Sequence, residues 1–417
     1  MEVNVMFLTV GEKIRNCRRI YQLKQISFSK FGISQHYLSM IESQKRQPTI
    51  DMINQIYDAF DSLTQGKIQT LYDKESFRQT PSEQARLFLR SRCKNGVIHE
   101  HYEESVEIAN QYDVTDALYD LNMLMGQYYQ ELLQYEISNN YFMMAVHEAI
   151  KRGENLSDAY RELAFNAKQT LNYKIALSYY VLANQYTEDK TSLVYYQGER
   201  HIVFIYIKLN QVESAMGIIH RVIQEDRFTQ ITADMYMLKF YAYYKQEQWE
   251  MAKLIMNQFI EENLYEPYLV RAYHNLAEGY YRLKQYEEAM TYVEQAIKLR
   301  GNSDKLFLSQ FVKGKIHHEL NNYNEAKKYY GQSQDFMLSH FDYENIQEWY
   351  CFNIKLFHEL GEYDQVFVLL NEIKKRSLTG MISEGFLNEI KFKLMEWKCK
   401  SMTDEEKQTY YLAILKF

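Results

Sequence analysis

Small residues recur along the chain at a fixed spacing, and this pattern limits the possible folds more than any other feature. In the clearest copy, Ala277 is followed twelve residues later by Ala289 and seven residues after that by Ala296. Small residues at this spacing let two antiparallel helices approach closely. Similar copies step by 37 to 40 residues, a period that predicts an array of helix pairs. Other copies begin at Gly126, Ala164 and Gly314, and looser copies, which do not begin with a small residue, start at Val203, Phe240 and Ile354.

The composition agrees with a helical array. Only three prolines and 15 glycines interrupt the 417 residues, and 46% of the residues are apolar, so long helices and a large core are both available. In most copies an aromatic residue stands three positions before the middle small residue, where it is expected to close the turn between the two helices. These aromatic residues are Tyr135, Tyr173, Trp249, Tyr286, Tyr323 and Tyr363.

One copy carries a family signature. Its residues Tyr273-x-x-Leu276-Ala277-x-x-Tyr280 resemble the tetratricopeptide repeat. The resemblance implies an all-α fold in which seven or more helix pairs stack into a right-handed solenoid with a concave groove. Such grooves hold extended peptides or partner helices, and the first helix of each pair lines them. The pattern is lost near the end of the chain, so residues 384–417 are expected to cap the array.

The repeat register also predicts which side chains line the groove. Counted from Ala277, the groove positions carry Arg271, His274 and Glu278, and Asn275 matches a position whose amide can clamp a peptide backbone. The same offsets in other copies carry cations and aromatic rings, which suit a short peptide with an anionic terminus and apolar side chains. These residues are Arg161, Phe165, Lys168, Arg200, Phe204, Tyr241, Tyr244 and Lys315.

The first 62 residues show a different pattern of short helices. A predicted first helix carries Val10, Ile14 and Cys17 on one face. Residues 25–31 give a short second helix that Gly32 ends. Ser34 is a good N-cap for a third helix, in which Leu38 and Ile41 share the buried face. Pro48 then blocks this helix, and a fourth begins after it.

Residues 32–48 read Gly-Ile-Ser-x-x-Tyr-Leu-Ser-x-Ile-Glu-x-x-x-Arg-x-Pro and resemble the λ-repressor-like helix-turn-helix of Xre-type regulators. The resemblance implies that the third helix enters the major groove of DNA, where its early residues touch base edges and nearby cations hold phosphates. The base-edge candidates are Gln35, His36, Tyr37 and Ser39. The phosphate candidates are Lys45 and Arg46, together with Lys24 and Gln25.

Two further expectations concern the end of this third helix. In the family, the glutamate at the position of Glu42 pairs with a basic residue of the first helix, so Arg15 or Arg19 is its expected partner. The family usually has a glycine where this chain has Gln44. A residue other than glycine costs free energy there if its φ must be positive.

A predicted linker separates this head from the repeats. Residues 63–77 are expected to form one more helix, Pro81 disfavours helix at the residue before it, and Ser82 can cap the next helix. The predicted domains are therefore 1–62 for DNA binding, 63–82 as a linker, 83–383 for the repeats and 384–417 as the cap. Residues 1–60 carry a net charge of +3, which leaves −10 for the rest, as expected if only the head binds a polyanion.

A helix-turn-helix head followed by tetratricopeptide repeats resembles the peptide-pheromone receptors of Gram-positive bacteria, the RRNPP group. The resemblance implies a cytoplasmic, homodimeric transcription regulator that binds a double-stranded DNA operator and is controlled by a short signalling peptide in quorum sensing. Two alternatives remain. In one, the repeats bind and inhibit a protein partner such as a response regulator; in the other, they only oligomerise a repressor.

Other functions find no support in the sequence. It contains no phosphate-binding loop, nucleophile elbow or zinc-protease motif, so neither an enzyme nor a cofactor is expected. His317 and His318 are adjacent on a predicted helix and point about 100° apart, which argues against a shared metal ion. The four cysteines are scattered and predicted to be reduced core residues. No signal peptide or membrane span is predicted, which agrees with the cytoplasm.

Overall fold

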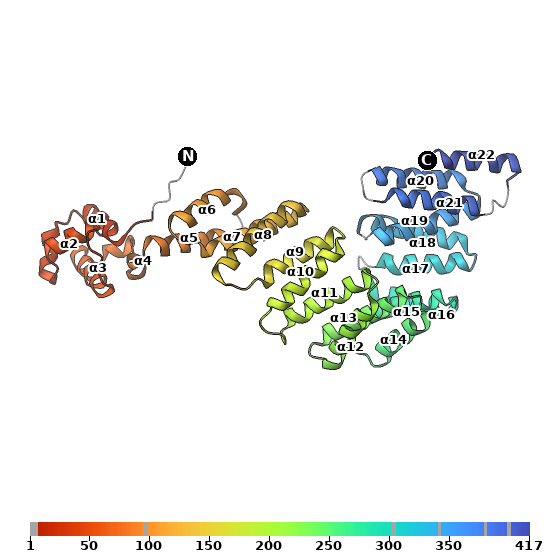
Figure 1. Cartoon of the computed structure of the whole chain (residues 1–417), viewed down its shortest axis with the longest axis horizontal. Coiled ribbons are helices and arrows are strands. Elements are labelled where there is room, and N and C mark those ends of the chain that lie inside the picture. Colours follow the sequence, from red (N-terminus) through yellow and green to blue (C-terminus); the bar gives the residue numbers. More distant parts are fainter. Residues whose placement is uncertain (1–6, 95–97, 302–305, 341–342, 379–381, 398–401) are drawn as a thin grey trace. The chain divides into compact units, whose positions relative to one another are not determined.

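The computed structural model describes residues 7–94, 98–301, 306–340, 343–378, 382–397 and 402–417, and all its regular elements are helices (Figure 1). The all-α prediction is therefore confirmed. The chain divides into two compact units, residues 1–198 and residues 199–417, and α11 (Leu193–Lys208) contributes to both. This division does not test the domain limits predicted from the sequence, which stay a prediction.

The first unit contains the head and the first helix pairs. Its elements before α11 are α1 (Val10–Ile20), η1 (Gln25–Phe31), α2 (Gln35–Glu42), α3 (Ile50–Thr64), η2 (Lys67–Thr70), α4 (Lys74–Arg78), α5 (Pro81–Lys94), η3 (Ile98–Glu100), α6 (Tyr102–Gln111), α7 (Asp116–Glu131), α8 (Tyr135–Arg152), α9 (Ser157–Gln169) and α10 (Tyr173–Tyr186).

The second unit continues the helix pairs to the end of the chain. After α11 come α12 (Val212–Glu225), α13 (Thr229–Lys245), α14 (Trp249–Glu261), η4 (Glu266–Tyr268), α15 (Leu269–Arg282), α16 (Tyr286–Arg300), α17 (Leu306–Glu319), α18 (Tyr323–His340), α19 (Tyr343–Leu360), α20 (Tyr363–Leu378), α21 (Glu384–Glu396) and α22 (Asp404–Leu415).

The recurring small residues lie where the two helices of a pair meet. Ala277 on α15 and both Ala289 and Ala296 on α16 are fully buried. Gly126 on α7 shows why the spacing needs small side chains, since a methyl group there would lie 2.4 Å from the Phe142 ring of α8. The predicted helix-pair packing is therefore confirmed.

The recurring aromatic residues start the second helix of most pairs. Tyr286 begins α16, and its ring contacts Tyr281 at the end of α15, with ring centroids 6.0 Å apart. Trp249 begins α14 in the same way and contacts Tyr244 at 4.9 Å. The aromatic residues therefore close the turns, as the spacing predicted.

Each of these turns also contains a residue in the left-handed conformation, two positions before the second helix. Most of these residues are not glycine, and a side chain costs about 1 kcal/mol there. The positions and their φ angles are Leu133 (60°), Leu171 (59°), Asn210 (59°), Glu247 (58°), Lys284 (60°), Asn321 (59°) and Gly361 (75°). The repeat therefore fixes a backbone conformation at this position regardless of the residue type.

Replacing Lys284 with glycine should stabilise the second unit by about 0.5 to 1 kcal/mol, because glycine adopts φ of 60° without a side-chain clash and Lys284 is exposed. Urea unfolding followed by tryptophan fluorescence measures this unit alone, since Trp249, Trp349 and Trp397 all lie in it. Asn321→Gly is the matched control and should change stability little, because asparagine tolerates this conformation. Equal gains for both variants would contradict this explanation.

The head has its own hydrophobic core. Ile14 of α1, Phe28 of η1, Leu38 of α2 and Phe60 of α3 are fully buried in it, and Phe77 of α4 joins them. Phe60 packs edge-on against Phe28 at 4.7 Å. The short helices predicted for residues 10–60 are therefore present, and the core extends beyond residue 62 to include α4.

The prediction of one helix over residues 63–77 was wrong. The helix α3 ends at Thr64, and Gln65 and Gly66 follow with φ of 54° and 82°. The Thr64 hydroxyl donates to the Phe60 carbonyl and accepts from the Ile68 amide, so it supplies the turn with local hydrogen bonds. These left-handed residues break the helix, and η2 and α4 follow as separate elements.

The next helix is capped by a different residue from the one predicted. Pro81 is the first residue of α5, and Thr80 precedes it. The Thr80 hydroxyl accepts from the Glu83 amide at 3.2 Å, while the Glu83 carboxylate accepts from the Thr80 amide at 2.8 Å. Ser82 therefore lies inside the helix, because proline is best placed in its first turn.

A buried lysine joins the head to this segment. Lys13 of α1 is fully buried, and its Nζ donates to the backbone carbonyls of Ser76 at 2.6 Å and Gln79 at 2.8 Å. Burial lowers the pKa of Lys13 to about 8. The side chain satisfies carbonyls at the end of α4 and so fixes α4 against α1.

The cysteines that the structure describes have free thiols. Cys17 is buried in the head, whereas Cys93 and Cys351 are partly exposed. The prediction for Cys399 lies outside the described residues.

Candidate functional site

The predicted recognition helix is α2. Ser34 caps it by accepting from the Tyr37 amide at 3.2 Å. Leu38 and Ile41 are buried, so the helix is anchored through one face. The opposite face carries exposed polar side chains that can hydrogen-bond to an external surface, namely Gln35, His36 and Ser39.

The other DNA candidates lie around this helix. Tyr37 is half-buried, and the Arg46 guanidinium lies 4.7 Å from the centre of its ring, so the two side chains hold each other in place. Lys24, Lys45 and Arg46 are exposed. Gln44 has a φ of 59°, which is the strained conformation for which the family uses glycine.

Glu42 has a different partner from either residue expected. Its carboxylate accepts from Arg18 Nε at 2.8 Å and from Arg18 Nη2 at 3.0 Å. Arg15 instead donates to the Glu42 backbone carbonyl, and Arg19 is exposed. The reason is geometric, because Arg18 lies one turn after the buried Ile14 and so faces α2. Gln25 Nε2 donates to the same carboxylate at 3.0 Å, so this DNA candidate also has a structural contact.

Three predicted peptide contacts lie in the first unit, all on α9. Arg161 donates to Asp158 at 2.9 Å and to the Ser157 hydroxyl at 2.9 Å. Lys168 Nζ lies 5.1 Å from the centre of the Phe165 ring. All three candidate side chains are partly exposed, so they form a short strip of cations and an aromatic ring along one helix.

The nine other candidates lie in the second unit, and Asp234 brings two of them together. Arg200 Nη1 donates to Asp234 Oδ2 at 3.1 Å, and Arg271 Nη1 lies 3.8 Å from Asp234 Oδ1. Tyr268 also donates to Asp234 at 3.0 Å. Asp234 is buried, and these contacts come from α11, α13, α15 and η4.

An aromatic pair lies beside these charges. The rings of Phe204 on α11 and Tyr241 on α13 are stacked with centroids 6.5 Å apart. Lys208 Nζ lies 5.7 Å from the centre of each ring. Successive first helices therefore place a cation and two partly exposed rings together, as the repeat offsets predicted for this surface.

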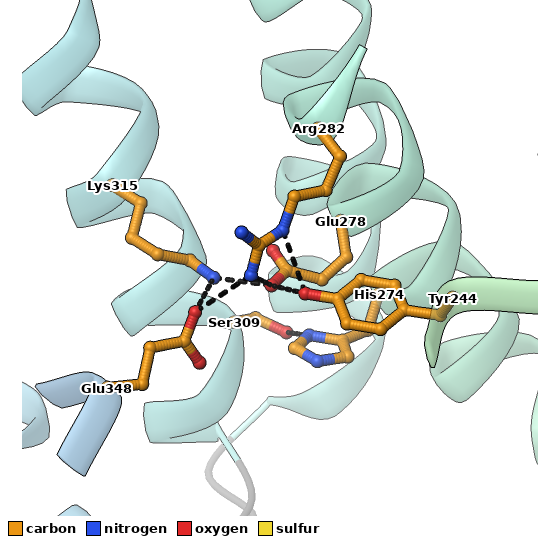
Figure 2. Close-up of polar contacts among 7 residues, drawn as sticks. All are labelled: Tyr244, His274, Glu278, Arg282, Ser309, Lys315 and Glu348. Atoms are coloured by element: carbon orange, nitrogen blue, oxygen red, sulfur yellow. Dashed lines mark hydrogen bonds and ion pairs between the residues drawn. The ribbon is translucent and has the colours of Figure 1, made fainter. Parts of the chain in front are cut away.

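A cluster of charged residues forms further along the same set of helices, and Figure 2 shows it. We call Tyr244, Glu278, Arg282, Lys315 and Glu348 the charge cluster. Lys315 Nζ donates to Glu278 and, at 3.2 Å, to Glu348. Arg282 donates to the Tyr244 hydroxyl at 2.8 Å and to Glu348 at 3.1 Å, which closes the network.

Burial makes the contacts within the charge cluster strong. The side chain of Lys315 is 1% exposed and that of Glu278 is 12% exposed. Burial alone would raise the pKa of Glu278, but the cations Lys315 and Arg282 hold it below its ordinary value. Burial, followed by the nearby Glu278 carboxylate, raises the pKa of the Tyr244 hydroxyl. The Glu278 carboxylate is therefore held in its ionised form by the two cations beside it.

His274 and Asn275 lie on α15, the helix that also carries Glu278 and Arg282. His274 Nδ1 lies 3.3 Å from the Ser309 hydroxyl (Figure 2). Burial, together with the charges of Arg300 and Lys315, lowers the pKa of His274 to about 3, so its ring is neutral at neutral pH. Asn275 Nδ2 lies 3.5 Å from the Met237 sulfur and 3.8 Å from the Met256 sulfur, which are weak acceptors. Its amide is therefore poorly satisfied for a partly buried group.

The sequence reasoning missed two of the anions, Asp234 and Glu348. The sequence does contain a pattern that identifies them, because the predicted groove residue Arg271 lies six residues before Ala277. The same offset from Phe240 and Ile354 gives Asp234 and Glu348. From Ala164 it gives Asp158, the partner of Arg161. In these three copies, the position six residues before the first repeat residue carries an anion that pairs with a candidate.

Comparison with known proteins supports the repeat fold. Residues 268–339 match the tetratricopeptide repeat family. No curated protein matches the sequence. The apo form of the quorum sensor NprR from B. thuringiensis is 14% identical, with a TM-score of 0.50 over 87% of this chain and 98% of that chain. Aspartyl phosphate phosphatase F from Bacillus subtilis is also 14% identical, with a TM-score of 0.50 over 90% of this chain and 95% of that chain. At these identities the likeness is one of fold.

No helix in the part of the chain that the structure describes combines the length and apolar character needed to cross a bilayer. Within the same residues, no three His, Cys, Asp or Glu side chains gather as ligands of one metal ion would.

Proposed function

We propose that this chain is a DNA-binding transcription regulator whose repeats bind a short signalling peptide. The proposal that the chain binds DNA rests on one observation. The helix α2 is anchored by buried Leu38 and Ile41, presents Gln35, His36 and Ser39 to solvent, and is followed by exposed Lys45 and Arg46. Polar side chains on a short anchored helix, with cations just beyond it, suit base edges and phosphates in a major groove.

The peptide part rests on the first helices of the repeats. In the second unit these helices bring together Arg200, Asp234 and Arg271 and the stacked rings of Phe204 and Tyr241. Such a surface offers cations for a carboxylate and rings for apolar side chains. NprR, one of the structurally similar proteins, is a quorum sensor, which is consistent with this proposal. We further propose that the regulator acts in the cytoplasm as a homodimer.

The proposal is tested by recovering genomic DNA fragments that bind the purified full-length protein and sequencing them. We expect one enriched site with two-fold symmetry, because a dimer presents two recognition helices. A lack of enrichment, both with and without cell extract as a source of peptide, would contradict the proposal. It would favour the alternative that the repeats bind a protein partner, which the fold shared with aspartyl phosphate phosphatase F allows.

Substitutions in the head should separate selectivity from affinity. Gln35→Ala should reduce discrimination between the enriched site and unrelated DNA by about 1 to 3 kcal/mol, because it removes a base-edge contact. Arg46→Ala should weaken binding to all sequences alike and reduce the salt slope by about 1, because it removes a phosphate contact. Fluorescence anisotropy at several salt concentrations measures both effects.

Lys74→Ala is the control for the loss of one positive charge. Lys74 pairs with Asp58 at 2.7 Å and was not predicted to touch DNA, so its removal should leave the salt slope unchanged. If Gln35→Ala keeps full selectivity, the assignment of this residue to a base edge is wrong.

The peptide part has its own test. Peptides captured from cell extract by the full-length protein are eluted and identified by mass spectrometry. The same capture with a variant carrying alanine at Arg161, Arg200 and Asn275 should lose at least nine tenths of the retained peptide. Equal capture by the two proteins would show that the peptide uses none of these three side chains.

A further inference from the structure

A pocket of about 780 Å³ lies inside the first unit, between the head and α5. One wall is the end of α2 and the loop after it, including Ile41, Arg46 and Pro48. Another wall is the start of α3, and a third consists of α4 and α5 with Arg78 and Leu87. The volume is in the range of pockets that bind small molecules. None of the predicted peptide contacts lines this pocket, so it is separate from the proposed peptide surface.

One side of the pocket is apolar and exposed to solvent. Ile50 is 67% exposed and Leu87 is 51% exposed, although both are large apolar side chains. Single exposed apolar residues are common on proteins. Here two of them line one pocket together with Pro48, and the buried Ile41 and Ile53 also contribute to its lining. An apolar group bound between them would remove this surface from water.

Five charged residues line the pocket, and three of them have contacts elsewhere. Glu83 caps Thr80, and Arg86 pairs with Asp116 at 2.9 Å. Arg46 stacks on Tyr37. Glu75 is exposed in the first turn of α4, where solvent and the helix N-terminus stabilise its carboxylate. Arg78 is the remaining charge.

Arg78 has no hydrogen bond or ion pair among the residues that the structure describes. Its Nε is buried without an acceptor. Arg78 is the last residue of α4, where the free carbonyls would ordinarily attract a cation. Lys13 already binds the carbonyls of Ser76 and Gln79 there. The guanidinium is therefore positioned at the pocket while its obvious local acceptors are occupied, and an unsatisfied buried donor is costly.

We propose that this pocket is a second ligand site, which binds a small amphipathic carboxylate. The carboxylate accepts from the Arg78 guanidinium, whose planar donors match two carboxylate oxygens. The apolar part lies against Ile50 and Leu87. Gln44, Arg46 and Pro48 belong to the same pocket, so a bound ligand contacts the loop that follows the recognition helix. The site is thus placed to couple a metabolite to that loop, independently of the peptide.

Isothermal titration calorimetry of the full-length protein with octanoate, without DNA or peptide, tests the site directly. We expect one equivalent to bind, and we expect octanamide, which lacks the charge, to bind at least tenfold more weakly. Arg78→Gln should weaken octanoate binding at least tenfold, because it removes the cation. Leu87→Asp should do the same by placing a like charge beside the ligand, and Leu87 is exposed enough for the variant to fold.

Arg90→Gln is the matched control. Arg90 is exposed on the same helix as Leu87 and does not line the pocket, so octanoate affinity should be unchanged. Equal binding of octanoate and octanamide, or equal loss in Arg78→Gln and Arg90→Gln, would overturn the proposal. So would an Arg78→Gln variant that binds octanoate normally but binds DNA more weakly, since Arg78 would then be a phosphate contact. Because the calorimetry contains no DNA or peptide, its result does not depend on the proposed function.

Discussion

Replacing Lys315 with methionine should lower the free energy of unfolding of the second unit by about 3 kcal/mol. Methionine fills a similar volume but carries no charge. The Glu278 carboxylate, only 12% exposed, would lose the cation with which it makes its closest contact. Arg282 would remain, but its Nη2 is 4.0 Å from Glu278 Oε1. Urea unfolding followed by tryptophan fluorescence reports on this unit, because it contains all three tryptophans.

Two variants separate the burial of charge from the loss of any lysine. Lys328→Met is the matched control, because Lys328 forms an exposed pair with Glu325 on the neighbouring α18 and should cost less than about 0.5 kcal/mol. The double variant Lys315→Met with Glu278→Gln should recover much of the loss, since it no longer buries an unpaired carboxylate. A loss below about 1 kcal/mol in Lys315→Met alone would mean that water reaches the charge cluster.

Acidification should destabilise the second unit through His274. The pKa of this ring is about 3 in the folded chain and about 6.5 in an unfolded chain. Below pH 6.5 the unfolded chain therefore binds a proton that the folded chain excludes. The contribution of His274 to the free energy of unfolding is present above pH 6.5 and is lost progressively as the pH falls towards 3. Each pH unit is worth about 1.4 kcal/mol, which gives a loss of about 2 kcal/mol between pH 6.5 and pH 5.

The measurement is the free energy of unfolding, from tryptophan fluorescence in urea, at pH 7.5, 6.5, 5.5 and 5.0. His274→Gln should be less stable at pH 7.5 but should lose about 2 kcal/mol less than the unaltered protein between pH 6.5 and 5. His220→Gln serves as the control, because His220 is exposed and its variant should keep the full pH dependence. If His274→Gln shows the same pH dependence as the unaltered protein, folding does not lower the pKa of His274.

The repeat architecture could be predicted from the sequence because its physical cause is local. A pair of helices can touch closely only where side chains are small, so Ala277, Ala289 and Ala296 mark the contact wherever the pair lies. The aromatic residue that closes the turn, Tyr286, stands three residues before Ala289, and this spacing too is visible in the sequence. The helix α2 was equally clear, since the cap at Ser34 and the buried Leu38 and Ile41 lie within one short segment.

Part of the candidate site could also be predicted, because offsets from the small residue fix which face of the first helix a side chain occupies. Tyr244, Glu278 and Lys315 were selected in this way, and the structure brings them into one network. The sequence did not reveal that they bond to one another. A pattern of offsets places residues on a surface, but whether two charges on that surface pair or stay apart depends on distances across separate helices.

The remaining features were decided by tertiary structure. The family resemblance left Arg15 or Arg19 as the partner of the Glu42 carboxylate, whereas the packing of α1 against α2 brings Arg18 to it. Residues 63–77 have enough apolar side chains for one helix, but the left-handed Gln65 and Gly66 turn the chain so that Phe77 can reach the head core. Among the described residues the Arg78 guanidinium has no acceptor, because Lys13, which lies far away in sequence, occupies the carbonyls at the end of α4. Local spacing determines helices and their contact faces, whereas the partner of a charge depends on which distant groups the fold brings within hydrogen-bond distance.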